Sequence, residues 1–460
     1  MKTSSPERWA IIGGGMLGLT LAKRLARSGK QITILEASDT LGGLASAWQL
    51  DDVVWDRHYH VTLLSDIRLR CLLSELGLEE EMKWVTSKTG VYADGTLYSV
   101  SNALEFLQFP PLKFLDKLRL GGTILYGSRI KDWKTLENIG VETWLRRWSG
   151  DRTFEKFWLP LLRAKLGENY KKASAAFIWA IIARLYAARR SGLKEELFGY
   201  LPGGYARLFE RFQTSLEEDG VDIQLGQPIQ AIKSEPQGGL SVHLSSGDVS
   251  HFDQVVVTAA APTAARLCPE ISQEERDRLN NIQYQGIICA SLLLKKPLSP
   301  YYVTNITDTW VPFTGVIEMT TLVDPAEFGG RTLVYLPKYV DPADPAFDLS
   351  DQELEDQFVS GLEQMYPDFH RSDVLSFQVS RVKNVLAIST LGYSQSLPPM
   401  HTSVPGLHII NSAHILNGTL NVNETVQLAE QAALELRSES GGRSPQAPAR
   451  AKAGVGVYYL

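Results

Sequence analysis

The segment from Trp9 to Glu36 limits the fold of this chain more than any other part of the sequence. A short apolar run leads into Gly13-Gly14-Gly15-Met16-Leu17-Gly18, which is followed by a helical pattern and then by Gln31-Ile-Thr-Ile-Leu-Glu36. This order predicts a buried strand, a tight glycine turn, a helix and a second, parallel strand that ends in an acidic residue. Such a unit is typical of the start of an α/β domain of the Rossmann-like type.

The residues of this segment indicate a site for a dinucleotide. Gly13 lets the chain turn off the strand, Gly15 lets the backbone approach a pyrophosphate, and Gly18 lets the helix pack closely on the sheet. Glu36 stands 23 residues after Gly13, close to the interval of about 20 residues expected for a carboxylate that binds a ribose hydroxyl. A glycine turn in an unrelated α/β protein is the alternative, but the complete order of elements favours dinucleotide binding.

A second glycine pair narrows the choice of cofactor. Gly42-Gly43 follow soon after Glu36 and are succeeded by Leu44, so the backbone can approach a long ligand a second time. At this point the sequence resembles the flavin-dependent amine oxidase and protoporphyrinogen oxidase superfamily, which also includes phytoene desaturases and, more distantly, UDP-galactopyranose mutase. The resemblance implies FAD, with the glycine pair along its pyrophosphate and flavin. Leu44 stands where many amine oxidases have arginine, which counts against that branch.

A polar cluster, Arg57-His58-Tyr59-His60, follows the glycine pair. The resembling family has an aspartate and a histidine in this region, near the isoalloxazine. Because histidine titrates near neutral pH, Arg57, His58 and His60 are candidates for proton transfer or substrate orientation. A histidine that is hydrogen-bonded to the backbone beside the flavin is an alternative of equal weight.

Composition sets wider limits on the protein. With 460 residues, 44% of them hydrophobic, the chain can bury a large core in two or more domains. The formal net charge of −6 argues against nucleic acid as the main partner. The three cysteines are far apart, which suits a reducing compartment and predicts no metal site. The sequence enters its first strand at once, so no cleavable signal is expected.

No apolar run has the length of a membrane-spanning helix. The nearest, residues 173–188, includes Arg184 and predicts a buried helix. The alternative is an interfacial helix that contacts a hydrophobic substrate or a membrane surface.

The middle of the chain predicts an inserted substrate domain. Residues 102–190 are helical in pattern and rich in aromatic side chains, and residues 287–340 contain β-rich runs. Several amine oxidases carry a lysine beside the flavin in the first of these strands, and Cys289 stands near that place here. We expect an FAD-binding domain at 1–90, 198–275 and 395–437, an inserted α+β substrate domain at 91–197 and 276–394, and a flexible tail at 438–460.

Within the helical insertion, the segment from Phe157 to Gly167 looks like one seen in bacterial members of the protoporphyrinogen-oxidase-like group. It places Arg163 and Lys165 as candidates to face an anionic substrate. Such residues are more often solvated or paired with a nearby acid, which is the competing interpretation.

Two later segments resemble those with which chains of this superfamily re-enter the FAD-binding domain. The glycine pair, helix, strand and Pro-Ile unit of residues 203–229 implies that the backbone of Ile229 meets the adenine side. A strand at 406–413 precedes a helix whose Asn or Thr cap leaves N–H groups able to stabilise negative charge on reduced flavin. Here Asn411-Ser412 stand where the superfamily usually has an aspartate. Tyr393, in the approach to this segment, is a candidate wall of the substrate cavity.

These arguments give two sets of candidate residues. The predicted cofactor contacts are Gly13, Gly14, Gly15, Met16, Gly18, Glu36, Ala37, Gly42, Gly43, Leu44, Ile229, Ser412, Val422 and Asn423. The predicted catalytic residues are His58, His60, Arg57 and Tyr393.

The resemblance implies an FAD-dependent oxidoreductase that removes a hydride from a C–H bond of a small organic substrate to flavin N5. Oxygen, a quinone or another acceptor then reoxidises the flavin. The substrate is expected to be hydrophobic or anionic, and the protein to be cytoplasmic with peripheral membrane contact left open. Two alternatives remain, a mutase-like flavoenzyme that acts on a nucleotide sugar and a non-catalytic FAD-binding scaffold.

Overall fold

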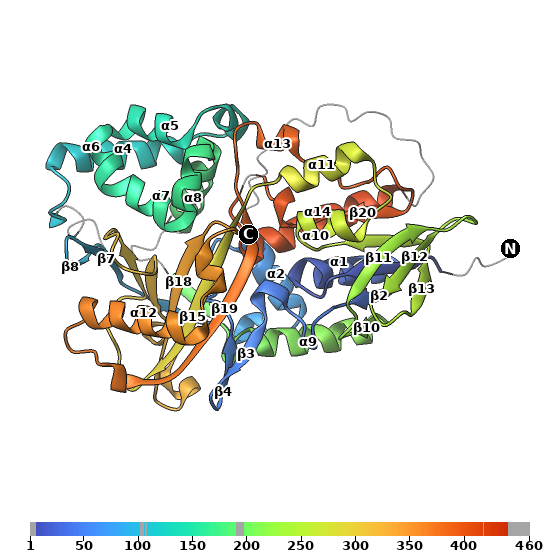
Figure 1. The fold of residues 1–460 in the computed structure, drawn as a ribbon, viewed down its shortest axis with the longest axis horizontal. Helices are drawn as coiled ribbons and strands as arrows, with labels where there is room; N and C mark the ends of the chain where they lie inside the picture. The colour runs from blue at the N-terminus through green and yellow to red at the C-terminus, as the bar shows by residue number, and fades with distance from the viewer. Residues whose placement is uncertain (1–5, 102–104, 106–107, 190–196, 417, 440–460) are drawn as a thin grey trace.

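The computed structural model describes residues 6–101, 105, 108–189, 197–416 and 418–439 (Figure 1). One half of the molecule is built on a five-stranded sheet in the order β10-β2-β1-β14-β20, whose neighbouring strands are all parallel. Its strands are β1 (Arg8–Ile12), β2 (Gln31–Leu35), β10 (Asp222–Gln224), β14 (Gln254–Val257) and β20 (Leu407–Ile409). The parallel pair predicted from Trp9 to Glu36 is therefore confirmed, together with the Rossmann-like α/β class.

Helices and a small antiparallel sheet cover the two faces of this parallel sheet. Along β1, Trp9 and Ile11 pack into one cluster and Ala10 and Ile12 into another, because successive side chains of a strand point to opposite faces. The first face carries α1 (Met16–Ala26), α2 (Ile67–Glu75), α9 (Gly204–Glu218) and α14 (Val422–Glu439). The second carries α10 (Ala261–Leu267), α11 (Gln273–Asn281) and the strands β11 (Ile229–Ser234), β12 (Leu240–Leu244) and β13 (Val249–Phe252).

The other half contains a seven-stranded sheet in the order β19-β15-β18-β17-β16-β7-β8. Its strands are β7 (Thr89–Ala93), β8 (Thr96–Ser99), β15 (Tyr284–Leu294), β16 (Val303–Ile306), β17 (Gly315–Glu318), β18 (Thr332–Val340) and β19 (Val374–Ala387). The two short β-type runs around Asp94-Gly95 predict a hairpin, and this hairpin joins β7 to β8. The helix α12 (Asp351–Met365) covers one face of the sheet, and the other face turns toward the glycine-rich half through Trp55 and Tyr59.

A bundle of helices forms the rest of this half, at the upper left of Figure 1. It comprises α4 (Phe114–Gly127), α5 (Val141–Ser149), α6 (Asp151–Thr153), α7 (Leu159–Leu166) and α8 (Ala175–Arg189). In α8, Phe177, Ile178 and Ile182 are buried, as expected for an interior helix. The interfacial alternative for residues 173–188 therefore gains no support from the described side chains.

Short strands and turns connect the two halves. The strands β3 (Ala47–Leu50) and β4 (Val53–Asp56) form a hairpin, and β5 (Thr62–Leu63), β9 (Leu197–Tyr200) and β6 (Lys83–Thr86) form a small antiparallel sheet. The short helix α13 (Tyr393–Ser396) precedes β20. The predicted tail at 438–460 begins inside α14, and residues 440–460 lie outside the described residues. The domain boundaries given above stay a prediction.

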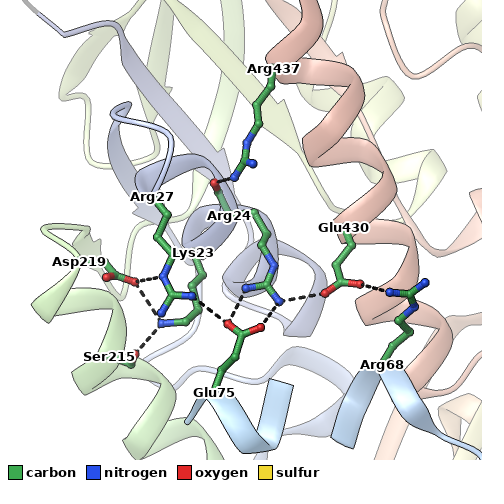
Figure 2. A network of polar contacts seen from close by, with 9 residues as sticks. All are labelled: Lys23, Arg24, Arg27, Arg68, Glu75, Ser215, Asp219, Glu430 and Arg437. Atoms are coloured by element: carbon green, nitrogen blue, oxygen red, sulfur yellow. Dashed lines mark hydrogen bonds and ion pairs between the residues drawn. The ribbon is translucent and has the colours of Figure 1, made fainter. Parts of the chain in front are cut away.

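Polar contacts tie together four helices that are remote in sequence (Figure 2). Arg24 of α1 bonds Glu75 of α2 at 2.6 Å and Glu430 of α14 at 2.9 Å. The adjacent residue of α1, the buried Lys23, donates to Ser215 of α9 at 2.6 Å. These contacts fix the C-terminal helix beside the helix that follows the first glycine turn.

Candidate active site

The first glycine turn forms a backbone cradle at the end of β1. Gly13 has a φ of +115°, and a Cβ on this residue would lie 2.4 Å from Thr258 Oγ1. A Cβ on Gly18 would lie 2.0 Å from the carbonyl oxygen of Gly13, so helix and strand approach too closely for a side chain. By contrast, a Cβ on Gly15 would meet nothing nearer than 3.9 Å, so this position opens toward free space. Gly15 caps α1, whose first turn contains no acidic residue, so its positive end is uncompensated.

Glu36 lies beside this cradle at the end of β2. Its Oε2 accepts a hydrogen bond from the Gly14 N–H at 2.6 Å, and its Oε1 accepts from the Ser38 N–H at 2.8 Å. The Gln227 N–H donates to the Glu36 carbonyl oxygen at 2.8 Å, which brings the segment before Ile229 alongside. Ala37 is exposed at the same edge. The carboxylate is thus held where a ribose next to a pyrophosphate on the cradle would meet it.

The second glycine pair lies directly against the first turn. The Gly42 N–H donates to the Gly14 carbonyl oxygen at 2.9 Å, and Gly15 and Gly42 form a parallel bridge. Gly42 and Gly43 have φ values of +115° and +56°, conformations that favour glycine. A Cβ on Gly43 would stand 3.3 Å from the Gly15 Cα. The two glycine segments, separated in sequence by a helix and a strand, therefore form one continuous backbone surface.

The C-terminal segment reaches the same region through α14. Leu17 of α1 and Val426 of α14 share one core cluster. The Asn421 side chain accepts from the Glu424 N–H at 3.0 Å, which is the asparagine cap predicted for this helix. The Asn423 Oδ1 accepts from the Arg68 N–H at 2.9 Å and thereby caps α2. The Asn423 side chain is therefore bonded within the protein. The groups that residues 422 and 423 offer to a ligand are their backbone N–H groups.

Asn411 and Ser412 follow β20. The Asn411 Oδ1 accepts from the Ala413 N–H at 3.1 Å, while its Nδ2 is buried without a partner among the described residues. Ser412 and Tyr393 line a small hollow together with Phe177 and Leu386. The Tyr393 hydroxyl donates to the Ala413 carbonyl oxygen at 2.9 Å, and burial raises its pKa. Tyr393 therefore serves as a wall whose hydroxyl is already bonded.

The histidine cluster, residues 57–60, directly follows β4. The His58 Nδ1 lies 2.9 Å from the Leu44 carbonyl oxygen and must donate to it, because a carbonyl only accepts. Burial lowers the pKa of His58 to about 4, so the ring is neutral at pH 7. In that tautomer the buried Nε2 is an acceptor, and it has no partner among the described residues. This hydrogen bond matches the backbone-bonded alternative for His58 and joins the cluster to the glycine pair.

Arg57 and His60 flank His58. The guanidinium of Arg57 lies over the ring of Trp48 at 5.5 Å, and its buried Nε has no hydrogen-bond partner within the described ranges. The His60 ring stacks on Tyr205 at 4.9 Å, and its Nδ1 lies 3.5 Å from the carboxylate of Asp56. The cation of Arg57 and the imidazole of His60 thus lie on either side of His58 in the sequence, each packed on an aromatic ring.

A chain of polar groups crosses from the helical bundle to the seven-stranded sheet. The Lys165 Nζ of α7 donates to the Tyr339 hydroxyl of β18 at 2.5 Å, and that hydroxyl lies 3.1 Å from the Tyr59 hydroxyl. Burial lowers the pKa of Lys165 and raises the pKa of Tyr59 well above its usual value. Cys289 of β15 lies near both tyrosines, whose pKa values it helps to raise.

Lys165 is a candidate from the sequence, but no sequence pattern indicates its contact with Tyr339, 174 residues away. The other candidate of that segment, Arg163, is exposed and bonds Glu168 at 2.9 Å, as in the competing interpretation of a cation paired with an acid.

The residues present fit an FAD molecule. The glycine cradle offers backbone without Cβ atoms, and the buried Arg57 Nε, His58 Nε2 and Asn411 Nδ2 are polar atoms that still lack partners among the described residues. None of the groups of acidic, histidine and cysteine side chains in the described part of the chain has the arrangement of a metal site. The architecture and this site define a dinucleotide-binding flavoprotein with an inserted substrate domain.

The family model for flavin containing amine oxidoreductases matches residues 17–436, and the chain belongs to this family. It is an FAD-dependent oxidoreductase that acts on a small-molecule substrate. It is 23% identical over 442 residues to 15-cis-phytoene desaturase from Solanum lycopersicum, covering 89% of this chain and 74% of that one. A 15-cis-phytoene desaturase from Glycine max is 35% identical over 291 residues, covering 58% of this chain and 49% of its own length.

Among solved structures, a proposed protoporphyrinogen oxidase from Exiguobacterium sp. 255-15 superposes with a TM-score of 0.75 and 21% identity. The match covers 95% of this chain and 99% of that one. At this identity the similarity shows the fold, and the family model shows the cofactor and the class of reaction. None of the helices in the described ranges combines the length and apolar character needed to cross a bilayer.

Proposed function

We propose that the protein oxidises a C–H bond of a small, largely apolar organic molecule that binds between the seven-stranded sheet and the glycine cradle. FAD, when bound, supplies the acceptor for the hydride at its N5. The observation that carries the proposal is the hydrogen-bonded chain Lys165, Tyr339 and Tyr59, in which Tyr59 directly follows His58, the residue whose ring bonds the Leu44 carbonyl. We infer from this chain that side chains of the substrate half extend toward the predicted flavin site.

The side chains around Tyr59 determine how the substrate is held. Tyr59 packs against a cluster that contains Trp55, Cys289, Tyr302 and Tyr335. These groups exclude water from the sheet face and leave few charges for a polar substrate to bind. The substrate is therefore proposed to be apolar rather than anionic, since Arg163 is already paired with Glu168.

Proton transfer is assigned to the Lys165 amine and to His58. Burial lowers the pKa of Lys165, and once the amine is neutral the hydrogen bond to Tyr339 can reverse, so that the amine accepts a proton relayed by the Tyr59 and Tyr339 hydroxyls. The neutral His58 ring offers its free Nε2 as an acceptor on the cofactor side. Arg57, His60 and Tyr393 are proposed to orient the substrate and to shape its cavity.

The test is anaerobic reduction of the flavin. The FAD-loaded protein is mixed with a panel of apolar polyenes, tetrapyrroles and amines, and bleaching of the flavin absorbance is followed. Bleaching by an apolar member supports the proposal, and bleaching by amines alone contradicts it.

Turnover of a nucleotide sugar only after chemical reduction of the flavin, with no net electron transfer, would favour the mutase-like alternative. A flavin that no substrate or cell extract reduces would favour the scaffold. A cytoplasmic location and a peripheral membrane contact remain proposals of the same kind.

A further inference from the structure

The helix α4 exposes an apolar face to solvent. On its outward side, Phe114, Leu115 and Leu118 are 64%, 70% and 54% exposed, and Leu125 and Tyr126 are 39% and 42% exposed. Gly121 and Gly122, which lie between them, are exposed as well. Residues at these spacings share one side of a helix, so the outward face forms an apolar stripe along the whole of α4.

The inward face of α4 is more polar than its outward face. Its buried residues are Lys117, Leu120, Thr123 and Gly127, and the Thr123 hydroxyl lies 2.9 Å from the Ser149 hydroxyl of α5. A surface helix of a globular protein normally buries its apolar stripe and exposes polar residues. In α4 the exposed face is instead the more apolar one, although Leu120 is buried, which indicates that the outward face meets an apolar partner.

The neighbouring helix α5 extends the face with an aromatic residue. Trp148 is 39% exposed, its ring lies 4.1 Å from that of Tyr126, and Arg147 lies over it at 5.7 Å. Elsewhere in the described residues, the exposed large apolar side chains are scattered singly, as at Val249, Leu375 and Leu434. Single exposed apolar residues are ordinary, whereas a contiguous group marks an interaction surface.

The charge around this face is positive although the chain is acidic overall. Residues 113–134 contain six basic and two acidic side chains, a net charge of +4, while the whole chain has a net charge of −6. Lys113, Arg119, Arg129 and Lys131 are exposed at the ends and edge of α4. An apolar stripe with interfacial Trp and Tyr and a basic border complements a bilayer that contains anionic lipid.

We propose that the outward face of α4, with Trp148, docks on the surface of a bilayer that contains anionic phospholipid. The helix lies along the bilayer surface, with its apolar side chains at the boundary between headgroups and acyl chains and its basic residues among the headgroups. In Figure 1, α4 and α5 lie at the outer end of the helical bundle, away from the parallel sheet. The docking surface does not depend on the chemistry of the proposed reaction.

Vesicle sedimentation tests this proposal with the FAD-loaded full chain. Vesicles of phosphatidylcholine alone are compared with vesicles that contain one third phosphatidylglycerol, at low and high salt. We expect binding to the anionic vesicles that weakens with salt, and a partition coefficient at least about tenfold lower for the variant Leu115→Ser/Leu118→Ser. The control Leu375→Ser/Leu434→Ser removes two leucines that are 44% and 65% exposed on other surfaces and should bind as the unmodified protein does. Flavin content and thermal unfolding show that each variant is folded.

A second measurement locates the contact. Brominated acyl chains should quench the fluorescence of the bound protein, and Trp148→Phe should remove most of that quenching because Trp148 adjoins the stripe. The proposal is overturned if the unmodified protein does not bind anionic vesicles, or if both double variants lose binding equally. It is also overturned if the protein is a dimer that Leu115→Ser/Leu118→Ser converts to a monomer, since the face would then bind a second copy.

Discussion

The cofactor side and the substrate side of the proposed site are built by different means. On the cofactor side, the backbone of Gly13 to Gly15 and of Gly42-Gly43 forms the surface, and the absence of Cβ atoms is what makes it usable. On the substrate side, Tyr59, Lys165 and Tyr339 come from three distant segments, and their side chains form the chain of polar groups. A backbone surface tolerates few substitutions but is visible in the sequence, whereas a side-chain assembly appears only in the folded protein.

The largest effect is expected from adding side chains to the glycine cradle. Gly18→Ala places a Cβ 2.0 Å from the Gly13 carbonyl oxygen, and such overpacking should destabilise the protein by about 3 kcal/mol or more. The Cβ of Gly15→Val meets no protein atom nearer than 3.9 Å, and its side chain enters the space assigned to the pyrophosphate. It should fold normally and bind FAD at least about a hundredfold more weakly, a loss of about 2.7 kcal/mol.

Thermal unfolding measures the stability of both variants, and FAD titration measures their affinity for the cofactor. Gly122→Ala is the control, because a Cβ there meets nothing within 4 Å. Normal FAD affinity in Gly15→Val would show that the dinucleotide lies elsewhere.

On the substrate side, Lys165→Met should slow flavin reduction by about 10² to 10⁴-fold and leave FAD affinity unchanged. The lowered pKa of Lys165 gives the sign of the pH effect. The base is the neutral amine, so the rate should rise with pH as Lys165 loses its proton, and Lys165→Met should lack this rise. Tyr339→Phe should have a smaller effect, because it removes the relay but keeps the amine.

Lys171→Met, at an exposed lysine that bonds Glu168, is the control for these rates. Unchanged reduction kinetics in Lys165→Met would remove the lysine from the reaction and leave His58 as the remaining candidate base.

Acid should destabilise the protein through two buried histidines. Burial lowers the pKa of His58 and of His408 from 6.5 to about 4 in the folded state. The unfolded chain therefore binds more protons between pH 6.5 and pH 4, and stability falls as the pH falls through this window. Each histidine contributes on the order of 3 kcal/mol at most.

Urea unfolding at several pH values should show a shallower acid loss in His58→Asn and no change in His251→Asn, whose side chain is exposed. An unchanged pH profile in His58→Asn would mean that the imidazole is accessible to water.

The smallest effect is expected where a predicted cofactor residue performs a structural task. Asn423→Ala removes the cap of α2 and should cost about 1 kcal/mol of stability. FAD affinity should stay within a few fold of the normal value, because the backbone N–H of residue 423 is retained. A loss of FAD binding with stability unchanged would place the Asn423 side chain at the flavin.

The sequence predicted the elements whose information is local. The strand, turn, helix and strand of residues 9 to 36 and the hairpin at Asp94-Gly95 are encoded by neighbouring residues, and the structure has both. The resemblance supplied the family and the cofactor, which the family model supports. It gave no way to see that Lys165 meets Tyr339, because pairing between distant segments depends on how the bundle packs on the sheet.

The sequence also does not show which helix exposes an apolar face to solvent. The apolar pattern of residues 173–188 suggested an interior helix with an interfacial alternative, and the structure buries Phe177 and Ile182 of that segment. The exposed apolar face belongs instead to residues 114–126, whose periodicity alone does not tell which side faces the core. Only the packing of α4 on α5 shows that its polar side is buried.

The most direct test of the account is a crystal structure of the protein with FAD bound. The account predicts one FAD per chain, with its pyrophosphate against Gly13 to Gly15 and Gly42-Gly43, its ribose at Glu36, and its isoalloxazine between His58 and the N-terminus of α14. An FAD bound on another surface, or an isoalloxazine remote from α14, would contradict it.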